Sequence, residues 1–321
     1  MKIVLTDCKT ITDGDLDLSL LEKFGEVVRY ELTPYDKIAE RIKDADAIIC
    51  NKTPLNENTI KDAKNLKYIG LFATGYNNID TKYADKRGIT VCNAGSYSTD
   101  AVAQHTFAFI LNHFNNVANY DAFVKDSGWI NSETFSPFVF PLNELAGKTI
   151  GIIGCGSIGM KVAEIAHAFG MKVLAYSRHA GKNTYIKWTA FNTLLAESDV
   201  VTVHCPLNEQ SEKMFNRDTF TKFKNGAYFI NTARGGVLDE NALYDALESG
   251  KLSGAAIDVL ETEPMDKDCV LMKAKNITLT PHIAWAPIET RIRLLDIVIS
   301  NLENFINGTS QNVVNAPKVD R

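Results

Sequence analysis

Residues 148–159 have the sequence Lys-Thr-Ile-Gly-Ile-Ile-Gly-Cys-Gly-Ser-Ile-Gly, in which an apolar run leads directly into three glycines. Gly154, Gly156 and Gly159 have the spacing G-x-G-x-x-G. In such a loop the first glycine makes a tight turn, the second lets the backbone approach a pyrophosphate, and the third lets the next helix pack closely on the strand. The N–H groups at the start of that helix then face the phosphates. Because the spacing alone is a weak signal, its surroundings have to support it.

The residues after the glycines complete a strand–loop–helix–strand unit. Apolar residues recur at helical spacing and predict one buried stripe: Ile158, Val162, Ile165, Ala166 and Phe169. Gly170 follows where a helix-ending glycine belongs, and the apolar run 171–176 predicts the next strand. The whole unit has the length of a βαβ crossover. We therefore predict a dinucleotide site rather than a flexible glycine-rich turn.

Composition excludes several classes of protein. The chain has 321 residues, which favours about two domains, and its apolar content of 45% is ample for two cores. The net charge is −5, without a basic cluster, so we expect no nucleic-acid partner. We also expect no membrane partner, because no apolar run approaches the roughly 18 residues of a membrane span and the N-terminal strand turns polar at once.

The six cysteines are scattered singly and form no C-x-x-C pair: Cys8, Cys50, Cys92, Cys155, Cys205 and Cys269. This pattern predicts buried core thiols, with neither a disulfide framework nor a metal site. We therefore expect a cytoplasmic protein without a bound metal.

Residues 2–93 alternate short apolar strands with amphipathic helices, which predicts a parallel, doubly wound sheet. Its expected strands are 3–5, 27–30, 47–50, 68–72 and 90–92, and its expected helices include 19–24, 35–43 and 81–87. A second α/β unit begins at Lys148. Its later strands are expected at 200–204, 227–231, 254–259 and 277–280, with a helix at 239–249.

Two helices are expected to join the units. An apolar helix from Ala101 to about Asn112 leaves the first unit, and a helix over 287–305 has no partner strand nearby, so we expect it to return to the first unit. This gives a discontinuous domain, 1–99 plus 287–321, and a second domain, 100–286, with a hinged cleft between them. Residues 115–147 are predicted to be an irregular interface arm, because their aromatic side chains are too apolar for a simple linker.

Three polar residues follow strand ends of the second unit, where open α/β sheets bind their ligands. Arg234 lies in NTARGGVLDE (231–240), Glu263 in DVLETEP (258–264) and His282 in TPHIAWA (280–286). Singly, they could be a surface ion pair, a turn carboxylate and a core histidine. Together at strand ends, they indicate a catalytic group.

These segments resemble the NAD(P)-dependent D-isomer-specific 2-hydroxyacid dehydrogenase family over essentially the whole chain. ATGYNNID (73–80), GCGSIG (154–159) and HCPL (204–207) match as well. Within the family, GYNNID and PHIAWA are similar to glycerate dehydrogenase/hydroxypyruvate reductase members. The resemblance implies a flavodoxin-like substrate domain (1–99 plus 287–321), a Rossmann cofactor domain (100–286) and a homodimer formed through the 115–147 arm.

The resemblance also implies a role for each site residue. Arg234 would bind the substrate carboxylate and polarise its ketone with its fork of donors. His282 would be the acid/base, and Glu263 would hold its tautomer and favour its protonated form. Asn51 and the amides of Ala73, Thr74 and Gly75 would complete the substrate site.

The implied cofactor site extends beyond the glycine loop. Asp258 would face the nicotinamide carboxamide, although a strand-end cap is the alternative, and His204 would line the site through its backbone. The remaining residues expected there are Ser157, Ile158, Ser177, Arg178, Cys205, Pro206, Thr232, Ala233, His282 and Ala284. We expect structural roles for His105 and His113, which would pack or face the surface, and for His167 on a solvated helix face.

One feature departs from the pattern of NAD-binding members. The strand 171–176 is followed by Ser177 and Arg178, where an acid would bind the ribose hydroxyls. An acid repels a 2′-phosphate, whereas Ser177 and Arg178 tolerate one. NAD or NADP is therefore expected, with a slight preference for NADP. Alternatively, Arg178 is a surface residue that stacks on adenine.

The sequence thus predicts interconversion of a small 2-keto acid and its D-2-hydroxy acid, with hydroxypyruvate or glyoxylate as the leading substrates. D-lactate or another D-2-hydroxy acid is the alternative within this class. A cofactor-sensing corepressor-like binding protein is the alternative from another class, and the presence of Arg234, Glu263 and His282 argues against it.

Overall fold

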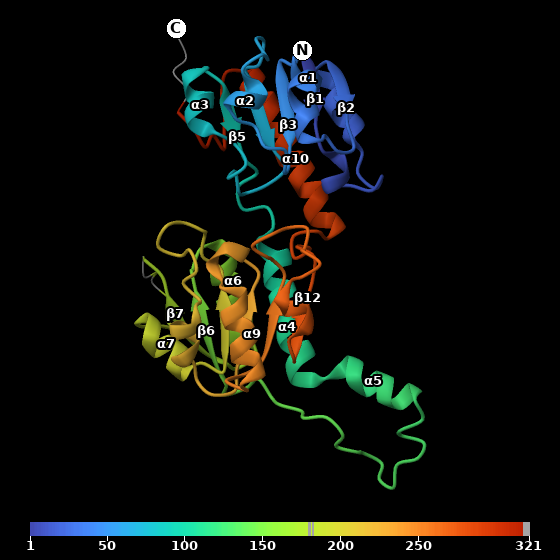
Figure 1. The fold of residues 1–321 in the computed structure, drawn as a ribbon, viewed down its shortest axis with the longest axis vertical. Helices are drawn as coiled ribbons and strands as arrows, with labels where there is room; N and C mark the ends of the chain where they lie inside the picture. The colour runs from blue at the N-terminus through green and yellow to red at the C-terminus, as the bar shows by residue number, and fades with distance from the viewer. Residues whose placement is uncertain (179–180, 182, 317–321) are drawn as a thin grey trace. The chain divides into compact units, whose positions relative to one another are not determined.

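The computed structural model describes residues 1–178, 181 and 183–316, and the chain forms two compact units (Figure 1). One unit comprises Met1–Tyr97 together with the segment that begins at Ala286, and the other is Ser98–Trp285. Each unit contains one parallel sheet, which confirms the predicted fold class. Residues 317–321, which the sequence assigned to the first domain, lie outside the described residues.

The first unit is a five-stranded parallel sheet in the order β2-β1-β3-β4-β5. This is the flavodoxin-like order: β2 is added on one side of β1, and β3 and the later strands are added on the other side. Side chains from both faces are buried, as the apolar runs of the strands predict. The strands are β1 (Lys2–Leu5), β2 (Glu26–Arg29), β3 (Ala47–Cys50), β4 (Tyr68–Leu71) and β5 (Thr90–Cys92).

Several connections of the first unit are tighter than predicted. The expected helix 19–24 is the 3-10 helix η2, which Asp17 caps through the Ser19 amide and which ends at Gly25 with φ 146°. The expected helix 35–43 begins as the 3-10 helix η3 before α1. The helical elements are η1 (Cys8–Thr10), η2 (Leu18–Phe24), η3 (Tyr35–Lys37), α1 (Ile38–Ile42), α2 (Glu57–Ile60) and α3 (Thr81–Lys86).

The last long helix, α10 (Ile288–Ile306), packs against β4 of the first unit, as the sequence predicted. The rings of Tyr68 and Phe305 lie 4.8 Å apart between their centroids. Asn301 is buried and donates its side-chain amide to the Asn93 carbonyl at 2.8 Å. The amphipathic stripe of α10 therefore covers one face of this sheet.

The second unit is a seven-stranded parallel sheet in the order β12-β11-β10-β9-β6-β7-β8. Counted from β6, this is the Rossmann order with one strand added at an edge. The sequence did not predict β8, a three-residue edge strand that is too short for a period to show. The strands are β6 (Thr149–Ile153), β7 (Lys172–Tyr176), β8 (Ile186–Trp188), β9 (Val200–Val203), β10 (Ala227–Asn231), β11 (Leu252–Ile257) and β12 (Ile277–Leu279).

Helices surround this sheet, and α4 packs against α6. Asp239 caps α9 by accepting from the amides of Asn241 and Ala242 at 3.0 and 3.1 Å. The helical elements are α4 (Thr99–Asn115), α5 (Val117–Lys125), α6 (Ser157–Ala168), α7 (Phe191–Glu197), α8 (Arg217–Thr221), η4 (Gly235–Val237), α9 (Glu240–Glu248) and η5 (Val270–Lys273).

The 115–147 arm is not wholly irregular as predicted, because it contains α5. Asn116 adopts a left-handed φ of 48° and separates α4 from α5, which changes the chain's direction without ending the helical region. The rest of the arm extends away from the seven-stranded sheet (Figure 1). Ile130, Phe135 and Phe138 are 83%, 91% and 86% exposed, so the arm leaves large apolar side chains uncovered.

The expected burial of the cysteines holds for Cys50 and Cys92, whereas the other four are partly exposed. All six are free thiols. Among the described residues, no group of three or more His, Cys, Asp or Glu side chains is arranged to hold a metal ion. The helices of that same part of the chain include none that is long and apolar enough to cross a membrane.

Candidate active site

The carboxyl ends of β10, β11 and β12 are joined by a ladder of backbone hydrogen bonds. The Asp258 amide donates to the Asn231 carbonyl at 3.0 Å, and the His282 amide donates to the Asp258 carbonyl at 2.7 Å. Parallel strands direct the residues that follow them to one edge of the sheet. The loops that carry Arg234, Glu263 and His282 therefore all start from this edge.

The structure brings His282 and Glu263 together. Nδ1 of His282 lies 2.7 Å from Oε2 of Glu263, and Oε1 of Glu263 accepts from the Leu260 amide at 3.0 Å. Because a carboxylate only accepts, Nδ1 carries a hydrogen, and the neutral ring keeps Nε2 as its acceptor. His282 also has a left-handed φ of 56°, a conformation that its loop imposes.

Asp258 holds the loop in this conformation. Its carboxyl group is 1% exposed and accepts from the Thr280 hydroxyl at 2.5 Å, the Ile283 amide at 2.9 Å and the Ala284 amide at 3.0 Å. These donors flank His282 on both sides in sequence. Asp258 therefore acts as a strand-end cap, the alternative that the sequence analysis left open, and its expected contact with a nicotinamide stays a prediction.

His105 of α4 extends this network, although the sequence indicated only packing or surface exposure. Its Nε2 lies 3.1 Å from the Thr280 hydroxyl oxygen and 3.7 Å from Oδ1 of Asp258. Since the Thr280 hydrogen is donated to Asp258, Nε2 of His105 has to be the donor. Burial lowers the pKa of His105, and the Asp258 carboxylate opposes this effect. His105 thus serves the loop as a neutral donor.

The other two histidines assigned structural roles occupy different environments. His113 stacks on Tyr228 with ring centroids 3.9 Å apart, and burial lowers its pKa to about 4. His167 is exposed on α6 and stacks on Tyr185. Both positions agree with the sequence analysis.

Arg234 lies three residues beyond β10, in a loop that Asn231 shapes. The Asn231 side chain accepts from the Ala233 amide and donates to the Arg234 carbonyl, both at 3.0 Å. The Arg234 guanidinium is partly exposed and donates through Nη1 to the Ala233 carbonyl at 2.7 Å. A guanidinium has five N–H donors, so it can bind a carboxylate as well.

The glycine loop connects β6 to α6 at the point where the strand order reverses. Gly154 has φ 92°, and its amide donates to the Tyr176 carbonyl at 2.9 Å. On the other side of β6, the His204 amide donates to the Ile153 carbonyl at 2.7 Å. The ends of β7, β6 and β9 therefore meet where doubly wound sheets bind their ligands.

The residues present fit a bound dinucleotide. A Cβ on Gly154 would lie 2.6 Å from the Cys205 amide nitrogen, and one on Gly159 would overlap the Gly154 carbonyl oxygen. At Gly156, by contrast, a Cβ would meet no protein atom within 4 Å, so packing within the chain does not require a glycine there. A glycine at this position does leave the N-terminus of α6, which begins at Ser157, open to a pyrophosphate.

The remaining residues expected at the cofactor site differ in exposure. Arg178 is exposed and Ser177 is partly exposed. Burial raises the pKa of Cys205, and the charge of Arg178 opposes this rise. Burial lowers the pKa of His204 to about 3, and its Nε2 lies 3.0 Å from the Thr202 hydroxyl. The others are Ile158, Pro206, Thr232, Ala233 and Ala284, of which Thr232 and Ala284 are buried and Pro206 is exposed.

The expected substrate residues of the first unit lie in two loops. Ala73, Thr74 and Gly75 follow β4, and this loop is joined to the one after β5: the Ala94 amide donates to the Ala73 carbonyl at 2.9 Å, and the Asn93 side chain donates to the Thr74 carbonyl at 2.7 Å. Asn51 follows β3, is 5% exposed, and donates its side-chain amide to the Thr10 hydroxyl at 3.1 Å. The Asn51 side chain therefore joins the loop after β3 to the segment that contains Thr10.

Comparisons with known proteins identify the family of this chain. Residues 107–284 match the family model for the NAD binding domain of D-isomer specific 2-hydroxyacid dehydrogenases. The chain is 40% identical to hydroxypyruvate reductase of Blautia hydrogenotrophica, covering 98% of this chain and 100% of that protein. It is 37% identical to glycerate dehydrogenase of Methylorubrum extorquens, covering 98% of this chain and 99% of that protein.

A solved structure gives the same result. The D-lactate dehydrogenase of Aquifex aeolicus, solved with NAD and lactic acid, is 29% identical and matches with a TM-score of 0.85 over 98% of this chain and 100% of that one. The likeness extends over both units, as the sequence resemblance did. This chain belongs to the D-isomer specific 2-hydroxyacid dehydrogenase family.

Proposed function

We propose that this protein is an NAD(P)-dependent reductase of hydroxypyruvate or glyoxylate, which is equivalently a D-glycerate dehydrogenase in the oxidation direction. The observation that carries the proposal is the 2.7 Å hydrogen bond between His282 and Glu263, at the same sheet edge as the Arg234 loop. The match to hydroxypyruvate reductase and glycerate dehydrogenase supports the choice of substrate.

Three side chains divide the chemistry on a 2-keto acid. Arg234 binds the carboxylate and polarises the ketone, since its donors form a planar fork. His282 donates a proton from Nε2 to the developing alkoxide, because Nδ1 is held by Glu263. Glu263 fixes the ring and stabilises its protonated form. The nicotinamide cofactor supplies the hydride.

The first unit contributes the other part of the substrate site. The amides of Ala73, Thr74 and Gly75 bind the substrate carboxylate, and Asn51 completes this part of the substrate site. The hydrogen bonds that join the loops after β4 and β5 support this role, because they fix the backbone that presents the amides.

The cofactor is NAD or NADP, with a slight preference for NADP. The glycine loop Gly154, Gly156 and Gly159 binds the pyrophosphate together with Ser157 and Ile158 at the start of α6. Ser177 and Arg178 follow β7 and leave the ribose site without an acid, so a 2′-phosphate is not repelled. The other cofactor contacts are assigned to His204, Cys205, Pro206, Thr232, Ala233, Asp258, His282 and Ala284.

The assembly we propose is a homodimer formed through the 115–147 arm, whose Ile130, Phe135 and Phe138 are exposed. The six free thiols support a reducing, cytoplasmic location. Besides a second copy of the chain, the partner we propose is the small 2-keto or 2-hydroxy acid substrate.

A panel of 2-keto acids, each tested with NADH and with NADPH, examines the function directly. We expect the highest kcat/KM for hydroxypyruvate or glyoxylate. A higher value for pyruvate would favour a D-lactate dehydrogenase instead. Cofactor binding without turnover of any acid would favour a corepressor-like binding protein.

A further inference from the structure

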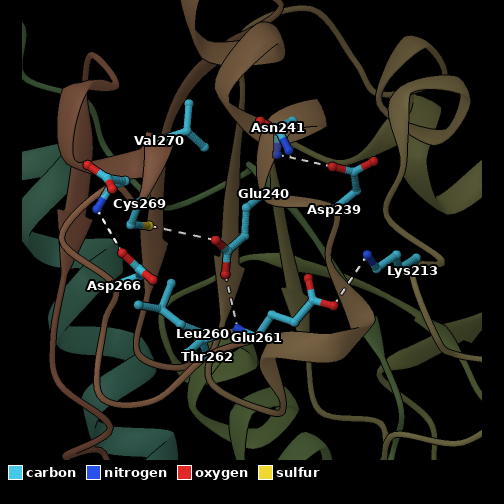
Figure 2. A pocket seen from close by; sticks show the side chains of 11 residues that line it. Lys213, Asp239, Glu240, Asn241, Leu260, Glu261, Thr262, Asp266, Cys269 and Val270 are labelled. Atoms are coloured by element: carbon cyan, nitrogen blue, oxygen red, sulfur yellow. Dashed lines mark hydrogen bonds and ion pairs between the residues drawn. The ribbon is translucent and has the colours of Figure 1, made fainter.

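The loop that carries Glu263 crosses the start of α9 and lines a pocket beside it (Figure 2). Glu240, the first residue of α9, lies at the centre of this region. Its Oε1 accepts from the Glu261 amide at 3.0 Å, and its Oε2 accepts from Sγ of Cys269 at 3.6 Å. One carboxylate therefore fastens the loop at two points, before and after Glu263.

The first of these points adjoins the catalytic pair. The amide of Leu260 donates to Oε1 of Glu263 at 3.0 Å, and the next amide in the chain, that of Glu261, donates to Glu240. Two consecutive N–H groups are thus bound by two different carboxylates. A rotation of the backbone between Leu260 and Glu261 would therefore strain both of these hydrogen bonds.

The same loop also lies against the residue that follows Arg234. A Cβ on Gly235 would overlap the Leu260 carbonyl group. On the other side, Lys213 donates its amide to the Gly236 carbonyl at 2.9 Å, and its ammonium group lies 3.3 Å from Glu261. The backbone of the Arg234 loop and that of the Glu263 loop are therefore packed together at Gly235.

Capping of α9 does not require the Glu240 side chain. Asp239 is the N-cap residue and already accepts from the amides of Asn241 and Ala242. The helix dipole also stabilises an acidic group in the first turn. A carboxylate that points into solvent would interact with the helix dipole equally well. The Glu240 carboxylate is instead directed to the Glu261 amide (Figure 2).

We propose that Glu240 is a positioning residue for the reaction, which holds the Leu260–Glu261 backbone so that Glu263 meets His282. The proposal rests on the proposed function for its catalytic meaning and on the hydrogen bonds of Glu240 and Glu263 for its geometry. Glu240 acts only through Glu263, and we assign it no contact with the substrate or the cofactor.

Glu240→Ala, Glu240→Gln and Glu248→Ala test this role. Glutamine keeps an oxygen for the Glu261 amide, whereas alanine removes it. Glu248 is the matched control, because it lies at the other end of α9 and accepts from the Lys275 amide at 3.1 Å. We expect Glu240→Ala to lower kcat about tenfold at unchanged cofactor KM, since a displaced Glu263 loosens the acid/base. Glu240→Gln and Glu248→Ala should stay within about twofold of wild type.

The pH profile and a double variant separate positioning from general stability. Glu240→Ala should move the high-pH limb of kcat/KM to lower pH, in the direction of Glu263→Gln, and should add less than about twofold in a Glu263→Gln background. A wild-type limb in Glu240→Ala, or losses that multiply in the double variant, would make Glu240 a structural residue and overturn the proposal.

A second measurement does not depend on turnover. The ring resonances of ¹³C-labelled His282, assigned with His282→Asn, can be titrated by NMR in the wild type and in each variant. We expect the midpoint to move to lower pH in Glu240→Ala and to stay in place in Glu240→Gln. An unmoved midpoint in Glu240→Ala contradicts the proposal. If the wild-type enzyme turned over no 2-keto acid while the midpoint still moved, the proposed function would fail and the positioning role would stand.

Discussion

Glu263 and His282 are 19 positions apart in sequence, and the structure joins them by a hydrogen bond of 2.7 Å between Oε2 and Nδ1. Each is held independently: Glu263 by the Leu260 amide, and the loop of His282 by Asp258. The pair is therefore preorganised, which is the condition for an acid/base whose proton leaves from one defined nitrogen.

This pair predicts a change in pH dependence. His282→Ala should lose at least about 100-fold in kcat for reduction, because no proton donor remains. Glu263→Gln should move the high-pH limb of kcat/KM to lower pH, since an amide does not stabilise a protonated imidazole. Glu261→Gln is the control, as that carboxylate pairs with Lys213. An unchanged profile in Glu263→Gln would separate Glu263 from the chemistry.

The planar fork of donors on Arg234 predicts that replacing it with another positively charged residue lowers kcat/KM. Arg234→Lys should fold normally and lose about 100-fold in kcat/KM, because a lysine cannot bind a carboxylate with two parallel hydrogen bonds. Arg217→Lys, at an exposed ion pair with Asp245, should have wild-type kinetics. Steady-state rates and a thermal melt check both expectations. Near-wild-type turnover in Arg234→Lys would remove Arg234 from the site.

The residues after β7 predict how the cofactor preference can be changed. Ser177→Asp should favour NADH over NADPH by about tenfold, which corresponds to about 1.4 kcal/mol, because the carboxylate accepts from the ribose hydroxyls and repels a 2′-phosphate. Arg178→Ala should weaken NADPH more than NADH. Ser177→Ala is the neutral control, and fluorescence titration gives each Kd. If neither change alters the ratio, these residues do not line the ribose.

The exposed arm predicts a concentration-dependent assembly. Sedimentation should show a dimer at micromolar concentration, and Phe135→Ser with Phe138→Ser should raise the dissociation constant at least about tenfold by removing two buried rings from an interface. Both rings are exposed in the single chain, so its folding should not change. Leu20→Ser, which alters an exposed side chain of the first unit, is the control. A wild-type monomer would contradict the proposed dimer.

The buried imidazole of His113 predicts how stability depends on pH. Burial lowers its pKa to about 4, whereas an unfolded histidine titrates near about 6.5. As the pH falls through this range the unfolded chain binds the proton first, so the free energy of unfolding decreases, by at most about 1 kcal/mol per pH unit for this group.

His113→Phe tests this dependence, because it keeps a ring against Tyr228 and removes the titration. Urea unfolding at about pH 7.5 and about pH 5.5 should show a smaller acid loss in the variant than in the wild type. Equal losses would show that His113 is not the group responsible.

Buried strands were the easiest elements to predict. β3, β5 and β10 have the predicted bounds, because each is a short apolar run that ends where the chain turns polar. α5 was missed because the aromatic and proline residues that follow it dominate the composition of the arm. The 3-10 geometry of η2 depends on the cap at Asp17 and on Gly25, which the apolar pattern does not express.

The site shows a similar division between local and distant signals. His282, Glu263 and Arg234 stand in recognisable segments after strands, so the sequence could identify them. His105 and Glu240 could not be recognised, because their roles depend on partners distant in sequence. His105 meets Thr280 across 175 positions, and Glu240 meets Glu261 across 21. Only the fold brings these pairs within hydrogen-bond distance.

The packing of α10 on β4 also implies an order in which the two units fold during synthesis. The ribosome makes β4 early, and it makes all of Ser98–Trp285 before it reaches Ile288. Until then the face of the sheet that Tyr68 shares with Phe305 has no cover. Domains fold as they emerge, so the inserted unit is finished before the unit that precedes it in the chain. The apolar face of the first sheet therefore stays uncovered while the ribosome synthesises the whole of the second unit.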